Sequence, residues 1–102
     1  MSVLDFVETW WFSVRTILEA AGVVIRFERS TGDRLNPSCG LNLRRGDLEA
    51  DLLVWDSGEA ELSVVEADGS VNQKHFYDIR NRQDLGYVLS RLASMATSTR
   101  ST

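Results

Sequence analysis

The side chains that most often serve as a general base or a nucleophile are scarce in this sequence, which contains one histidine and one cysteine. His75 falls in a segment expected to be a strand, where a lone histidine is more often structural than catalytic. Cys39 occupies an apolar position of an alternating pattern and has no visible base partner, which indicates a small buried side chain. No nucleophile elbow, P-loop or dinucleotide-binding glycine motif occurs. We therefore predict no catalytic, cofactor-binding or metal-binding residue.

Paired carboxylates are the remaining catalytic possibility, because glycosidases use two acids at a defined separation. The chain has 15 Asp and Glu residues, but nothing in the sequence marks two of them as buried. Such enzymes also need a cleft, which a domain of 102 residues rarely provides. One histidine and one cysteine further exclude a Cys/His zinc site within one chain and an intrachain disulfide. An enzyme is therefore the last of the functions considered.

An uninterrupted run of acidic residues is the sharpest charge feature. No Lys or Arg occurs between Gly46 and Gly69, and the net charge of −4 opposes the basic footprint of a nucleic-acid-binding protein. The run has two interpretations: a solvated face whose edge charges discourage strand pairing, or a surface that attracts a basic partner. Its acids are Asp47, Glu49, Asp51, Asp56, Glu59, Glu61, Glu66 and Asp68.

The elements that would hold these residues begin with a helix, predicted from Ser2 to Ala21. Ser2 suits the N-cap, Asp5 follows three residues later, and Gly22 suits the position after the helix end. Phe12 lies opposite the apolar stripe, where it would anchor an interface or pack beneath a loop. The stripe has helical spacing and comprises Val3, Val7, Trp10, Val14, Ile17 and Ala21, widened by Leu4, Trp11 and Leu18.

Alternation with period two predicts five strands after this helix. Turn chemistry separates them at 30–33, 36–38, 45–47, 57–58 and 68–69. The fifth strand carries Phe76 and Tyr77 side by side, and the pattern does not decide which of the two faces the core. The expected strands are 23–28, 39–44, 51–56, 59–66 and 71–78.

A two-residue turn at Ser57-Gly58 would set the register of the central hairpin. It places Trp55 opposite Ala60, Leu53 opposite Leu62 and Asp51 opposite Val64. Trp55 would then lie in the core, and Trp55→Ala would cost about 3–5 kcal/mol of stability. The other face would hold Leu52, Val54 and Val65, either as the apolar centre of an interface or as a second core layer under a helix.

A second helix is predicted after a cap at Asn81, with Tyr87 pointing away from its apolar stripe. That stripe comprises Leu85, Val88, Leu89, Leu92, Met95 and Ala96. The order helix, five short strands, helix favours an α+β fold with a five-stranded antiparallel meander. We expect a single domain over 1–96 and a polar tail over 97–102. No segment approaches the roughly 18 apolar residues of a membrane span, and no signal peptide is visible, so we expect a cytoplasmic protein.

Two runs of the chain carry a resemblance to a known family. The first is Asn36-Pro37-Ser38-Cys39-Gly40-Leu41-Asn42-Leu43, and the second is Trp55-Asp56-Ser57-Gly58-Glu59-Ala60-Glu61-Leu62. With the strand His75-Phe76-Tyr77 and the closing helix over 83–95, they make the chain similar to the TriTu family of bacterial immunity proteins. The chain departs from that family at Ala60, where the family has a cysteine, and in the tail beyond Met95.

The resemblance implies a function. Such proteins protect a bacterium from a polymorphic toxin used in interbacterial competition, including toxins delivered by type VI secretion. The toxin domain is an ADP-ribosyltransferase that uses NAD to modify elongation factor Tu. The immunity protein binds this toxin in the cytoplasm, expected to be 1:1, and blocks it without chemistry or a cofactor of its own. No nucleic-acid or membrane partner is implied.

The acidic hairpin is the expected contact with the toxin, because a site for the NAD pyrophosphate presents positive or donor-rich surface. The candidate partner-binding residues are Asp47, Glu49, Asp56, Ser57, Glu59 and Glu61. The alternative function is a small acidic secretion chaperone, which would be a homodimer that holds an unfolded effector segment in an apolar groove.

Overall fold

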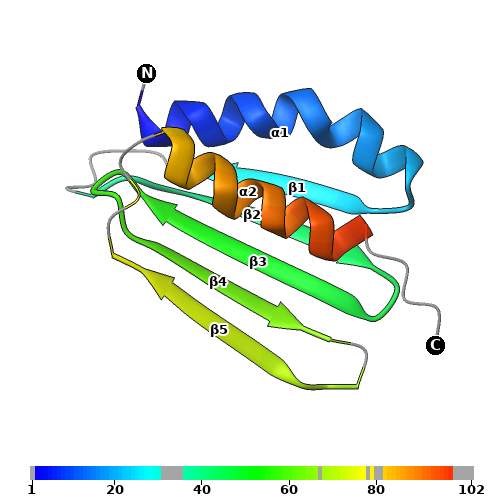
Figure 1. The fold of residues 1–102 in the computed structure, drawn as a ribbon. Coiled ribbons are helices and arrows are strands. Elements are labelled where there is room, and N and C mark those ends of the chain that lie inside the picture. The colour runs from blue at the N-terminus through cyan, green and yellow to red at the C-terminus, as the bar shows by residue number, and fades with distance from the viewer. Residues whose placement is uncertain (1, 31–35, 67, 78, 80–81, 98–102) are drawn as a thin grey trace.

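The computed structural model describes residues 2–30, 36–66, 68–77, 79 and 82–97. Its five strands form one antiparallel sheet in the order β1-β2-β3-β4-β5, which confirms the predicted α+β meander (Figure 1). The turn residues 31–35, the end of the predicted fifth strand at Asp78, the cap Asn81 and the tail residues 98–102 lie outside the described residues. The elements are α1 (Val3–Ala20), β1 (Val24–Arg29), β2 (Ser38–Arg45), β3 (Leu48–Trp55), β4 (Ala60–Val65), β5 (Val71–Phe76) and α2 (Arg82–Thr97).

Helix α1 begins and ends as predicted, but its buried stripe is rotated. Ser2 Oγ accepts a hydrogen bond from the Asp5 backbone N–H at 3.1 Å, and Gly22 adopts a positive φ of 87°. The fully buried residues are Leu4, Val7 and Leu18, with Trp10, Trp11 and Val14 partly buried against the core. The prediction was wrong at Ala21, which is exposed, and at Ile17, which is 70% exposed. At about 100° per residue, Ile17 lies roughly 100° around the helix from Leu18 and roughly 140° from Leu4, beyond the contact with the sheet.

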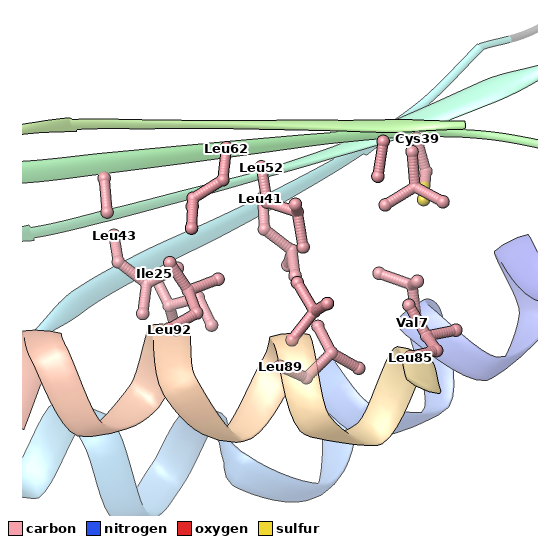
Figure 2. Close-up of a cluster of buried hydrophobic side chains, with 14 of the residues drawn as sticks. Val7, Ile25, Cys39, Leu41, Leu43, Leu52, Leu62, Leu85, Leu89 and Leu92 are labelled. Carbon is pink, nitrogen blue, oxygen red and sulfur yellow. The ribbon is translucent and has the colours of Figure 1, made fainter. Parts of the chain in front are cut away.

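Both helices pack on the same face of the sheet. Figure 2 shows Val7 from α1 and Leu85, Leu89 and Leu92 from α2 pointing toward the same layer of strand side chains. Five of the six apolar positions predicted for α2 are buried, and Met95 is partly buried. The strand side of the core is formed mainly by Ile25, Cys39, Leu41, Leu43, Ala50, Leu52, Val54, Ala60, Leu62 and Val64.

The predicted register of the central hairpin was wrong by one residue. Val54 pairs with Ala60, Leu52 with Leu62 and Ala50 with Val64. The cause is a three-residue loop, 56–58, in place of the predicted two-residue turn. Trp55 N–H donates to the Glu59 carbonyl at 2.9 Å and Gly58 adopts a φ of 102°, as in three-residue hairpin loops that end on a left-handed glycine.

This extra loop residue exchanges the two faces of β3, because side chains alternate along a strand. Leu52 and Val54 therefore belong to the core beneath the helices, which is the second of the two roles considered for them. Leu53 and Trp55 lie on the opposite face, and Trp55 is only half-buried. The large destabilisation predicted for Trp55→Ala is consequently no longer expected.

The last strand resolves the choice between its two aromatic residues. Phe76 packs against the core, whereas Tyr77 follows β5 and is exposed. Tyr87 is exposed on α2, and Phe12 is exposed on α1, as their positions off the apolar stripes predicted. Neither of these two side chains is covered by a described loop.

Burial of Cys39 makes its thiol a probe of the folded state. The residue is 2% exposed, and burial raises the pKa of its thiol to about 12. Because the thiolate is the reactive form, labelling by a disulfide reagent at pH 8 is expected to be on the order of 1,000-fold slower in the native protein than in guanidinium chloride. Stopped-flow absorbance measures both rates, and equal rates would contradict this burial.

Candidate interaction surface

The sheet face opposite the helices is not covered by any described element. We call it the open sheet face. It carries the outward residues of every strand, because core residues alternate with them. These residues are Val24, Arg26 and Glu28 on β1; Ser38, Gly40, Asn42 and Arg44 on β2; Glu49, Asp51, Leu53 and Trp55 on β3; Glu61, Ser63 and Val65 on β4; and Val71, Gln73 and His75 on β5.

Carboxylates on β3 and β4 make that part of the open sheet face acidic, while Arg26 and Arg44 lie on the same face of β1 and β2. Asn42 Nδ2 donates to Glu49 Oε2 at 2.9 Å and to Asp51 Oδ1 at 2.7 Å, which holds both carboxylates on the same strand side by side. Glu61 on β4 pairs with His75 on β5, and Glu61 Oε1 lies 3.9 Å from His75 Nδ1.

Apolar surface lies between these carboxylates. Leu53 is 36% exposed. Trp55, two residues further along β3 and on the same face, is half-buried. An apolar centre with charged neighbours is the usual composition of a protein–protein interface. Sequence reasoning assigned this role to Leu52 and Val54, because the predicted register exchanged the faces of β3.

A shallow groove of about 410 Å³ crosses the open sheet face where β2 carries a glycine. Gly40 pairs with Glu28 on one side and with Leu53 on the other, so those two side chains form the walls. A Cβ built at Gly40 would meet only the Leu52 carbonyl oxygen, at 3.8 Å. A glycine within a strand often marks a place where another molecule approaches the backbone.

The six candidate residues do not form one cluster. Glu49 and Glu61 lie on the open sheet face, whereas Asp56, Ser57 and Glu59 lie on the β3–β4 loop. Asp47 lies on the β2–β3 turn, at the other end of the eight-residue strand β3, which is roughly 25 Å long. The acidic run therefore extends along the whole hairpin, with both ends at turns.

The β3–β4 loop joins three segments of the chain. Asp56 N–H donates to the Pro37 carbonyl at 2.8 Å, and Asn36 Nδ2 donates to Ser57 Oγ at 3.3 Å. Ile79 N–H donates to the Gly58 carbonyl at 2.6 Å, which ties the segment before α2 to the same loop. The residues that carried the family resemblance thus hold the fold together, which the sequence pattern did not reveal.

Gly58 is expected to be the least replaceable residue of this loop. Its φ of 102° lies in a region that side chains with a Cβ rarely adopt, and it is buried. Gly58→Ala is expected to lower the free energy of unfolding by about 1–2 kcal/mol. Urea denaturation followed by tryptophan fluorescence measures this loss. The matched control is Gly86→Ala in α2, where a Cβ meets nothing within 4 Å and stability should rise. Equal effects of the two variants would contradict the role of the positive φ.

A second hollow, of about 690 Å³, lies beside α1. Arg29 Nη1 is 2.9 Å from both Asp5 Oδ1 and Glu8 Oε1, and the hydrogen bond from Arg29 lowers the pKa of Asp5. The Arg15 guanidinium stands 5.3 Å from the Trp11 ring centre. The ion pairs with Arg29 engage the carboxylates of Asp5 and Glu8 within the chain, so these two acids are less available to a partner.

The described part of the chain contains no group of three or more His, Cys, Asp and Glu residues placed to hold a metal ion. Neither of the described helices is long and apolar enough to cross a membrane.

Comparison with known families decides the identity. The family model described as immunity protein TriTu matches residues 5–94, from the first turn of α1 to near the end of α2. The chain belongs to the TriTu family of immunity proteins. No curated protein and no solved structure matches the chain.

The family confirms the resemblance drawn from the motifs. TriTu proteins are immunity proteins, and immunity proteins bind cognate toxins, so a protein–protein surface is the functional site to seek. The match includes every strand that contributes to the open sheet face.

Proposed function

We propose that the open sheet face and the adjoining β3–β4 loop bind a cognate ADP-ribosyltransferase toxin domain 1:1 in the cytoplasm and cover its NAD or target site. The observation that carries this proposal is a sheet face that no described element covers, with carboxylates around Leu53 and Trp55 at its centre. The protein acts by occupying space and needs no catalytic group.

Charge complementarity supports this choice of partner. A pocket that accepts the pyrophosphate of NAD uses cationic or N–H donor groups, since these recognise phosphate oxygens. Glu49, Asp51 and Glu61 would meet such groups when the toxin is bound. Their potential would also speed the encounter of the two proteins at low ionic strength.

Reversing two carboxylates near the β3–β4 loop should therefore weaken toxin binding. Glu59 and Glu61 are both exposed, so Glu59→Lys with Glu61→Lys should leave the fold intact. The dissociation constant measured by calorimetry at low salt is expected to rise about tenfold or more, ~1.4 kcal/mol. The control is Glu19→Lys, at an exposed position of α1. It reverses one charge away from the hairpin and should change the dissociation constant little. An unchanged affinity of the double variant would remove this end of the hairpin from the interface.

A further inference from the structure

The helix layer is narrower than the sheet. Helix α2 packs on β2 and β3, and α1 packs on β1, β2 and β3, while neither described helix packs closely on β4 or β5. Figure 1 shows these two strands extending beyond α2. Between α2 and strands β4 and β5 lies a groove of about 310 Å³, which we call the α2–β5 groove.

The α2–β5 groove has an apolar floor and a cationic rim. Leu62, Val64, Phe76, Val88 and Met95 supply the apolar surface. The charged residues that line it are Lys74 and Arg91, and no carboxylate is among its described lining residues.

Both cations rest on aromatic rings instead of carboxylates. Lys74 Nζ lies 5.2 Å from the Phe76 ring centre, and the Arg91 guanidinium lies 5.9 Å from that of Tyr87. Arg91 Nη1 also donates to the Tyr87 hydroxyl at 3.4 Å, and this contact lowers the pKa of Tyr87. Neither cation forms an ion pair with a carboxylate of the described residues.

Lys74 and Arg91 thus place positive charge above an apolar floor, in a chain of net charge −4. A ring attracts a cation only weakly at an exposed site, so both charges stay available to a carboxylate. The groove therefore complements a segment that combines apolar side chains with Asp or Glu.

The groove lies on the other side of the edge strand β5 from the open sheet face. Val71, Gln73 and His75 point to the open sheet face, whereas Asn72, Lys74 and Phe76 point to the groove. No described strand lies beyond β5, so a partner seated on the open sheet face meets the groove by passing one exposed strand.

We infer that the α2–β5 groove binds an acidic, apolar segment of the same toxin chain, as a second contact of opposite charge to the first. This inference rests on the proposed function. Two contacts of opposite sign admit one orientation of the toxin, since a rotated partner would bring like charges together at both.

The test measures toxin binding by two groove variants in the full chain, using the toxin domain encoded beside this gene. Lys74→Glu with Arg91→Glu reverses the rim, and Asn72→Trp fills the groove from an exposed position on β5. Each is expected to weaken binding at least tenfold, with an unchanged thermal midpoint. Arg15→Glu, on α1, is the control for lost positive charge. In hydrogen exchange, the amides of 71–76 should gain protection in the complex.

The outcomes separate the inference from the proposed function. If the wild type binds the toxin and both groove variants bind it within twofold of the wild type, the inference is overturned while the proposed function stands. If sedimentation shows a wild-type dimer that Lys74→Glu with Arg91→Glu dissociates, a second copy occupies the groove and the inference is also overturned. If the wild type does not bind the toxin at all, both fail.

Discussion

Leu52→Ala and Leu53→Ala, at neighbouring positions of β3, are expected to have opposite consequences. Leu52 is 1% exposed beneath the helices, so its truncation should cost about 2–5 kcal/mol of unfolding free energy. Leu53 points to the open sheet face, so its truncation should cost less than about 1 kcal/mol. The effects on toxin affinity should be reversed. Leu53→Ala should bind the toxin about tenfold more weakly than the wild type, because it removes the apolar centre of the surface. Urea denaturation and calorimetry measure the two quantities.

This pair is its own control, since the two variants remove the same atoms from adjacent residues. The register predicted from a two-residue turn gives the opposite assignment, with Leu53 in the core. A large loss of stability in Leu53→Ala and a small one in Leu52→Ala would therefore contradict the observed pairing of Val54 with Ala60.

Gly40→Val is expected to weaken toxin binding strongly without unfolding the protein. The new side chain would fill the groove between Glu28 and Leu53, while its Cβ meets only the Leu52 carbonyl oxygen at 3.8 Å. Valine also suits a strand better than glycine, so the thermal midpoint should hold or rise. Binding to the toxin domain is expected to weaken by about a hundredfold, ~2.7 kcal/mol, as measured by biolayer interferometry.

A graded series at Gly40 separates steric exclusion from other effects. Alanine fills little of the groove and should weaken toxin binding less than valine does. Tryptophan fills the most and should weaken binding more than either. If all three variants bind as tightly as the wild type while remaining folded, the toxin does not enter this groove.

Most of the architecture follows from local patterns in the sequence. The 3.6-residue periodicity of Leu85 through Ala96 and the alternation in β2 specified their elements, because burial on one side imposes a strict period. The glycines at 46 and 69 marked turns that have the expected positive φ. The phase of α1 was less certain from its sequence, since apolar residues occupy a wide arc and only packing on the sheet selects Leu4 over Ile17.

The candidate surface was harder to predict, because the loop between β3 and β4 is one residue longer than the sequence pattern indicated. Trp55 through Glu59 contain turn residues that suit either a two-residue or a three-residue loop. Hydrogen bonds from Ile79 and to Pro37 favour the longer loop, and both partners are distant in sequence. A local reading therefore exchanged the faces of β3, which hid Leu53 and Trp55 as surface residues. It also treated Asp56 and Ser57 as contact residues only, although they anchor the loop.

The most direct measurement is NAD-dependent labelling of elongation factor Tu by the toxin domain encoded beside this gene, with and without an equimolar amount of the immunity protein. Loss of labelling in the wild type, retained labelling with Gly40→Val, and co-elution of the wild type with the toxin are the expected results. Undiminished labelling together with the absence of a complex would contradict inhibition of this toxin through the open sheet face.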